Sequence, residues 1–127
     1  MGFHRWEDFP RTQNLRKGTW RCAVTMDKLT VQRGEIEPDT KFDSSTFHRH
    51  PEDQIIVMLK GKLHLQIGED KRWVEPGEFA AIPGDVFHSA IGVGPKGAEY
   101  VEILSSGRMD YLPGFVGTPK NEFKTDK

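Results

Sequence analysis

Residues 48–61 read HRHPEDQIIVMLKG and combine two closely spaced histidines with a run of apolar residues. His48 and His50 are separated by one residue, so in a strand their side chains would point to the same face. Gln54 opens the apolar run, which is typical of a buried strand and is expected to end in a turn at Lys60-Gly61. A break in the strand after His50 would bring Gln54 beside both histidines. The stretch therefore predicts three neutral donor groups in one place, and imidazole is a ligand that suits zinc, iron, nickel and copper.

A second stretch, residues 77–88, reads GEFAAIPGDVFH and ends in another histidine, His88. It contains a turn, a short apolar strand and a Pro-Gly corner before a further strand. A pair of histidines alone is most simply a surface feature. The downstream stretch favours a metal site, because it supplies a third imidazole.

Together the two stretches resemble the paired motifs of the cupin superfamily, G-x5-H-x-H-x3-4-E-x6-G and G-x5-P-x-G-x2-H-x3-N. This resemblance implies an all-β, single-domain cupin fold, a double-stranded β-helix or jelly-roll barrel. It also implies that one divalent transition metal is bound, and zinc, nickel, iron, manganese and copper are not distinguished. The ligands implied by the resemblance are His48, His50, Gln54 and His88.

The sequence departs from the family motifs at four positions. Phe42 stands at the first glycine, Gln54 at the acid, Asp85 at the glycine of P-x-G and Gly92 at the final asparagine. Either of the two carboxylates in the Glu52-Asp53 pair could instead take the place of Gln54. The identity of the fourth ligand therefore stays open between an amide and a carboxylate.

The rest of the chain also has an all-β pattern of short strands between Gly and Pro turns. The expected strands are residues 20–26, 29–37, 62–67, 72–75 and 98–104, with a flexible turn over 92–97 before the last of them. We predict an N-terminal arm over residues 1–19, a cupin barrel over 20–105 and a C-terminal tail over 106–127.

Composition narrows the classes of partner. The 127 residues carry a net charge of −1, which gives no basic footprint for a nucleic acid. No apolar run approaches membrane-spanning length and no apolar leader precedes the first strands, so we expect a cytoplasmic protein without a membrane partner. The only cysteine, Cys22, excludes an internal disulfide and a Cys-rich zinc site.

The alternation of side chains along a strand predicts which face is occupied by two further ionisable residues, His64 and Glu102. In the strand 62–67, His64 lies on the face opposite Leu63 and Leu65, so it is expected outside the barrel. In the strand 98–104, Glu102 shares a face with Leu104. If that face looks inward, Glu102 is an acid or base beside the metal; otherwise it is a solvated carboxylate or a partner of Arg33 or Arg108.

Among cupins, the chain is most similar to small single-domain proteins with an H-x-H-P-x-x-Q pattern, such as the pectin-degradation cupins that help open the ring of 4,5-unsaturated uronates. In that group glutamine is a ligand, and an aspartate and a phenylalanine line the active site. The corresponding positions here are Glu102 and Leu104. Substitution of both residues puts a uronate substrate in question, whereas acid-base chemistry by Glu102 survives the change.

We therefore expect a metal-dependent enzyme whose divalent metal acts as a Lewis acid for isomerisation, tautomerisation or lyase chemistry on a small oxygenated acid or sugar derivative. One alternative is an iron- or copper-dependent dioxygenase. Another is a non-catalytic small-molecule binding module, and a barrel whose histidines bind metal adventitiously is a third. A homodimer is expected, since the aromatic residues Trp6, Phe9 and Trp20 offer an apolar surface.

Overall fold

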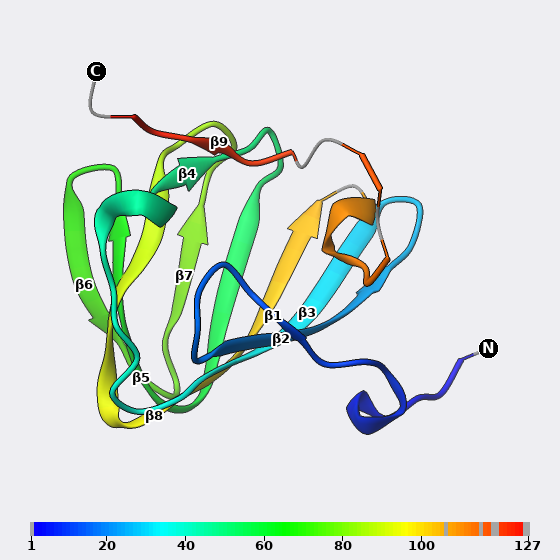
Figure 1. The fold of residues 1–127 in the computed structure, drawn as a ribbon, viewed down its shortest axis with the longest axis horizontal. Helices are drawn as coiled ribbons and strands as arrows, with labels where there is room; N and C mark the ends of the chain where they lie inside the picture. Colours follow the sequence, from blue (N-terminus) through cyan, green and yellow to red (C-terminus); the bar gives the residue numbers. More distant parts are fainter. Residues whose placement is uncertain (1, 106, 115, 118–119, 126–127) are drawn as a thin grey trace.

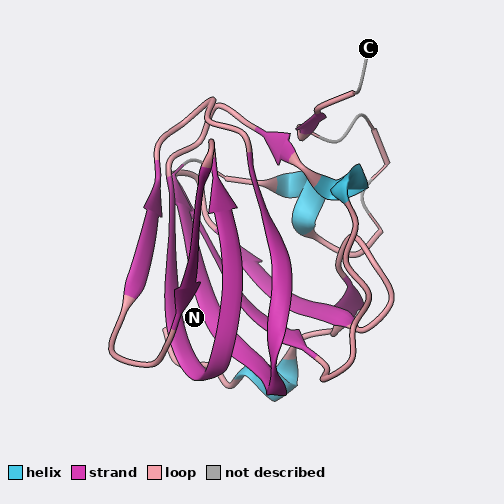
Figure 2. Ribbon diagram, turned by 90° about the vertical axis from the view of Figure 1, so that its left-hand side faces the viewer, coloured by secondary structure: helices cyan, strands magenta, loops and turns pink. Residues whose placement is uncertain are grey.

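The computed structural model describes residues 2–105, 107–114, 116–117 and 120–125. In these ranges nine strands, all paired antiparallel, form one sheet that curls around an interior space (Figures 1 and 2). The strands are β1 (Thr12–Gln13), β2 (Thr19–Thr25), β3 (Leu29–Ile36), β4 (His48–Arg49), β5 (Gln54–Ile67), β6 (Asp70–Val74), β7 (Phe79–Ile82), β8 (His88–Ser105) and β9 (Glu122–Phe123). Three short 3-10 helices complete the described elements: η1 (Trp6–Asp8), η2 (Ser44–Thr46) and η3 (Met109–Tyr111). The expected all-β fold is confirmed.

Two long bent strands, β5 and β8, connect the parts of the sheet. They pair with each other along their whole length, from Gln54 opposite Leu104 to Ile67 opposite His88. The turns predicted at Lys60-Gly61 and over 92–97 are wrong, because both segments lie inside these strands. The register between the strands shifts three times, at Met58/Lys60, Gly61/Leu63 and His64/Leu65. Such bulges bend a strand without ending it.

The bends divide the sheet into two halves that face each other. In one half, the C-terminal part of β8 lies between β3 and the N-terminal part of β5, with β2 and β7 beyond them. In the other half, the N-terminal part of β8 pairs with the C-terminal part of β5, and β4 and β6 flank this pair. The interior is the space between the two halves.

The interior is apolar near the bends and polar at the opposite end. Ile36, Met58, Leu63, Ala98 and Tyr100 belong to one buried apolar cluster close to the bends. Side chains alternate along each strand, so the same inward faces continue into the polar residues at the other ends of the strands. The sheet thus carries a polar group of side chains into a buried space.

The arm and the tail each add a strand to this sheet. β1 pairs with β2, and β9 pairs with β4, so the chain on both sides of the expected barrel range takes part in strand pairing (Figure 1). The division into an N-terminal arm (1–19), a barrel (20–105) and a C-terminal tail (106–127) stays a prediction. Within the described ranges, the structure has no helix with the length and apolar character needed to cross a membrane.

Candidate metal centre

Three buried histidines meet at the polar end of the interior. His48 on β4 lies directly opposite His88 on β8 in the strand register, and His50 follows two residues after His48. One ligand nitrogen from each of these histidines lies within 4.8 Å of the others. The ring centres are 4.6 Å apart for His48 and His88 and 5.0 Å apart for His50 and His88. The H-x-H pair and the distant third histidine therefore come together as the motif spacing predicts.

Each imidazole is oriented by the backbone in the same way. The Nδ1 atoms of His48, His50 and His88 lie 2.6, 3.1 and 2.9 Å from the carbonyl oxygens of Thr46, Glu52 and Val86. A carbonyl oxygen only accepts hydrogen bonds, so Nδ1 carries the proton in each ring. The Nε2 atoms then keep their lone pairs, which is the tautomer that suits metal binding through Nε2.

Burial keeps the three rings neutral. It lowers the pKa of His48 to about 4 and that of His88 to about 3, and it also lowers the pKa of His50. Neighbouring positive charges add to this effect, including Arg108 in all three cases. In addition, His88 Nε2 is buried without a hydrogen-bond partner among the described residues. Three neutral imidazoles with one unsatisfied buried lone pair fit a divalent cation.

Gln54 lies beside this cluster, and its Oε1 is 3.0 Å from His50 Nε2. In this orientation two acceptors face each other. That spacing is close to the one expected for two ligands of one metal, since metal bonds of about 2.1 Å at angles between 90° and 110° place ligand atoms roughly 3.0–3.4 Å apart. The geometry thus supports the amide as the neighbour of the histidines.

The two alternative carboxylates make other contacts, and Glu52 Oε1 lies 3.7 Å from Nδ1 of His50, the ring nitrogen that does not face the cluster. Glu52 accepts a hydrogen bond from the buried Arg108 at 3.0 Å, and Arg108 also pairs with Asp110. Asp53 is exposed and accepts the backbone N–H of Gly84 at 2.8 Å. Neither carboxylate belongs to the group of residues whose ligand atoms converge.

His64 is separate from this cluster, as its position in the alternation predicts. Its ring stacks on Trp73 with centres 4.5 Å apart, whereas Leu63 and Leu65 are buried in the core. The neighbouring strand β6 therefore provides the partner of His64 outside the barrel interior.

Glu102 lies on the inward face of β8 and lines the same cavity as His48, Gln54 and His88. Gln32 on β3, directly opposite in the register, donates from Nε2 to its carboxylate at 2.6 Å. Burial raises the pKa of Glu102 to about 7, partly offset by Arg21 and Arg108. The solvated reading of Glu102 is therefore wrong.

Glu102 is not an ion-pair partner of either arginine considered in the sequence. Arg33 pairs with Glu35 and Glu99 on the outer face of the sheet, and Arg108 pairs with Glu52 and Asp110. Glu102 is thus left as an ionisable group in the interior.

Three further residues, Gln32, Arg16 and Arg21, line this cavity of about 50 Å³ together with Glu102 and were not predicted from the sequence. The sequence contains a signal for two of these residues, Gln32 and Arg21. Strand alternation places Gln32 with the buried Thr30, and Arg21 with the buried Ala23, on inward faces. Arg16 precedes β2 in a loop, where alternation gives no information.

The fold is similar to that of several solved cupins. A RmlC-like cupin from Shewanella frigidimarina has a TM-score of 0.74 at 18% identity over 88% of this chain and 96% of the other. KdgF from Halomonas sp. has a TM-score of 0.73 at 21% identity, with 88% and 99% of the chains covered. A tryptophan-to-tyrosine variant of Bacillus subtilis oxalate decarboxylase has a TM-score of 0.69 at 20% identity, and the match spans 82% of this chain but 29% of that one.

A search among curated proteins finds no match. The family model of the cupin domain, in contrast, matches residues 24–104, which contain the three histidines, Gln54 and Glu102. That range covers both long strands almost completely. On this match and on the shared fold, the chain belongs to the cupin domain family.

Proposed function

We propose that this chain is a metal-dependent cupin enzyme that isomerises, tautomerises or eliminates from a small oxygenated acid or sugar derivative. The observation that carries the proposal is a buried carboxyl with a pKa of about 7, Glu102, in the same cavity as His48 and His88. Strongly perturbed ionisable groups beside a metal-binding cluster are typical of active sites.

The residues that would hold the metal are His48, His50 and His88, with Gln54 as the fourth ligand. A divalent metal bound by these four neutral groups would keep its full charge and would supply a Lewis acid that polarises a substrate oxygen. In each histidine the Nδ1–H group donates a hydrogen bond to a backbone carbonyl oxygen. These three hydrogen bonds hold the rings in an orientation that directs their Nε2 lone pairs toward one another.

Glu102 would move the proton. A pKa near the operating pH gives both the acid and the base form an appreciable population, which is what general acid-base catalysis requires. Gln32 holds one carboxylate oxygen, Oε2, by donating to it, and this contact fixes the direction of the group. The other oxygen is left to exchange a proton with a carbon or an oxygen of the substrate.

The supporting geometry favours proton transfer over the two alternatives. A carboxyl with a pKa near neutrality is the group that proton transfer to or from a substrate uses. Both alternatives nevertheless make distinct predictions, so the same experiment separates them.

The test is solvent-deuterium exchange, followed by proton NMR, with unsaturated uronates and hydroxy-ketones under nitrogen. We expect the parent protein to incorporate deuterium or form product, and Glu102→Gln to slow this by about 10²- to 10⁴-fold. Metal content, measured by elemental analysis, should stay unchanged in Glu102→Gln and fall in Gln54→Ala. Glu99→Gln is the matched control, since Glu99 lies on the same strand but pairs with Arg33 outside the interior.

Two results would contradict the proposal. Turnover that needs ferrous iron or copper and consumes oxygen, with none under nitrogen, would show a dioxygenase. Ligand binding that Glu102→Gln leaves unchanged, without turnover under either gas, would show a binding module.

A further inference from the structure

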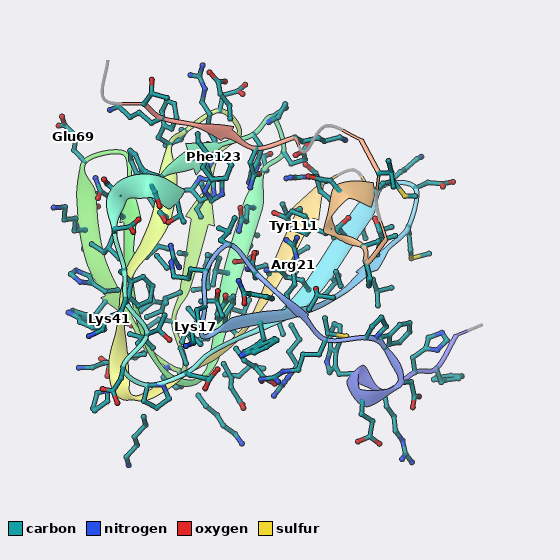
Figure 3. The ribbon with its side chains drawn as sticks, viewed as in Figure 1. Lys17, Arg21, Lys41, Glu69, Tyr111 and Phe123 are labelled. Atoms are coloured by element: carbon teal, nitrogen blue, oxygen red, sulfur yellow. The ribbon has the colours of Figure 1, made fainter. Side chains whose placement is uncertain are left out.

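Arg21 is a charged residue on the inward face of β2. In the register of β2 and β3, Arg21 lies opposite Gly34, and Ala23 lies opposite Gln32. Directly opposite residues share a face of the sheet, so Arg21 is on the inward face with Gln32. Its guanidinium lies 4.2 Å from the centre of the Tyr111 ring, and Figure 3 shows the two labelled side chains near each other.

This arginine has an unsatisfied donor. Its Nε is buried and has no hydrogen-bond partner within the described part of the chain. A buried N–H group without an acceptor is costly, because it has lost water without gaining a partner. A ligand that accepts hydrogen bonds would remove that cost.

A second arginine, Arg16, reaches the same cavity from the loop before β2. Its guanidinium lies 4.6 Å from the centre of the Phe42 ring and donates to the hydroxyl of Thr46. Thr46 is also the residue whose carbonyl orients His48. Arg16 therefore lies against the segment that leads into the histidine cluster.

The other six arginines of the chain differ from these two in a consistent way. Arg5, Arg11, Arg33, Arg49, Arg72 and Arg108 each lie within ion-pair distance of a carboxylate. Within the described ranges no such pair is found for Arg16 or Arg21, the two that line the cavity. The pattern concentrates unpaired positive charge in the interior.

Among the described residues, the only acidic side chain that lines this cavity is Glu102. With its pKa near 7, it does not fully neutralise even one of the two arginines at neutral pH. The cavity thus has a surplus of positive charge before any metal binds, and a bound divalent cation would add to it. Such a cavity selects an anionic ligand.

We propose that Arg21 binds the carboxylate of a small organic acid, with Arg16 adding to the positive field, while the rest of the acid faces the three histidines. The stack of Arg21 on Tyr111 covers one face of the guanidinium and leaves its N–H edge for a paired contact with a carboxylate. The cavity volume of about 50 Å³ suits an acid of few non-hydrogen atoms. This inference rests on the proposed function in one respect: it assumes that the ligand occupies the cavity in which the proposed reaction takes place.

The test compares glycolate with its neutral analogue glycolamide by isothermal titration calorimetry, on metal-loaded and on metal-free protein. We expect the metal-loaded parent to bind glycolate about ten- to hundredfold more tightly than glycolamide, because a hydrogen bond to a charged group contributes more than one to a neutral group. Arg21→Gln should remove most of this preference, and Arg21→Lys should keep part of it, since lysine retains the charge but loses the paired geometry. Arg33→Gln on the outer face is the matched control and should leave the preference intact.

Metal content and circular dichroism are measured on every variant, so a misfolded Arg21→Gln is recognised and Arg21→Lys then carries the comparison. A parent without preference for glycolate, or an Arg21→Gln protein that is folded and keeps the full preference, overturns the proposal. In the latter case, a preference that disappears on metal removal would assign the carboxylate to the metal. A protein that binds no metal would refute the proposed function, yet the metal-free protein should still prefer glycolate through Arg21.

Discussion

The chemistry of the candidate centre depends on how individual side chains are protonated. His48, His50 and His88 are buried and neutral, and a carbonyl fixes the tautomer of each. Burial raises the pKa of Glu102, although Gln32 donates a hydrogen bond to its carboxylate. The cavity therefore combines metal-binding lone pairs with one group that can exchange a proton near neutrality.

The pKa of Glu102 leads to a prediction about stability. The folded-state pKa lies above the ordinary value of about 4.5, so the folded protein holds this proton more tightly than the unfolded chain. The contribution of Glu102 to the free energy of unfolding is greatest below pH 4.5, falls as the pH rises and is smallest above pH 7. The total decrease is about 3 kcal/mol. Relative to Glu102→Gln, the metal-free parent should lose this amount between about pH 5 and pH 8.

Urea unfolding of the metal-free parent and of Glu102→Gln at several pH values measures this difference. The histidine contributions are common to both proteins and cancel in the comparison. A free-energy difference that does not change with pH would show that Glu102 titrates normally in the folded protein.

The separation of His64 from the cluster predicts how histidine variants bind metal. His88→Ala removes a ligand, so its metal affinity should fall by more than the roughly 10- to 100-fold that loss of an outer contact costs. His64→Ala should leave metal affinity unchanged, because His64 stacks on Trp73 outside the cluster. Equal losses in the two variants, measured by competition with a chelating dye, would break the assignment of the ligands.

At the scale of elements, the bends in β5 and β8 create the two facing halves of the sheet. Gly61 has a φ of +68° and Gly97 a φ of +77°, and they meet where the strands cross from one half to the other. A Cβ on Gly61 would lie 2.0 Å from the carbonyl oxygen of Gly97. Glycine is thus required at this bend for both its conformation and the close approach of the strands.

Gly61→Ala should therefore be much more destabilising than Gly68→Ala. Both positions have a positive φ, which costs an alanine about 1–2 kcal/mol, but no described atom lies within 4 Å of a Cβ on Gly68. The crowding at Gly61 should add about 1–3 kcal/mol. Thermal or urea unfolding of both variants measures this difference, and similar losses would show that the bend does not hold the two strands in contact.

At the scale of the whole molecule, the curled sheet encloses the site while its ends extend over the surface. Strand β9 pairs with β4, Arg49 pairs with Glu122, and the Phe123 ring lies 5.5 Å from the ring of His48 (Figure 3). Towards the other terminus, Trp6, Phe9 and Trp20 line a hollow of about 610 Å³ next to β2 and β3. Strand β9 thus lies against His48, whereas the N-terminal aromatic residues line an open hollow.

We propose that two chains pair through the N-terminal aromatic surface formed by Trp6, Phe9 and Trp20. Trp6 is 37% exposed, and a tryptophan at the centre of an interface is worth about 2 kcal/mol or more. Trp6→Ala should therefore raise the dimer dissociation constant by about 30-fold or more. Trp73→Ala, which removes a similarly exposed tryptophan from β6, should have no effect. Analytical ultracentrifugation measures both, and a parent that stays monomeric at high concentration would refute the pairing.

The sequence by itself determined the all-β fold, the outward position of His64 and the convergence of His48, His50 and His88. The all-β pattern and the position of His64 follow from turn residues and from the period of two along a strand, which are local properties of the chain. The convergence of the three histidines was implied by the resemblance to the cupin motifs. Only the tertiary structure decided that Lys60-Gly61 lies in a bend rather than a turn, since a bend exists only through pairing with a distant strand. It also decided that Glu102 faces inward, how Glu102 and the histidines are protonated, and that Arg21 keeps an unsatisfied donor, because desolvation depends on what the whole fold places around a group.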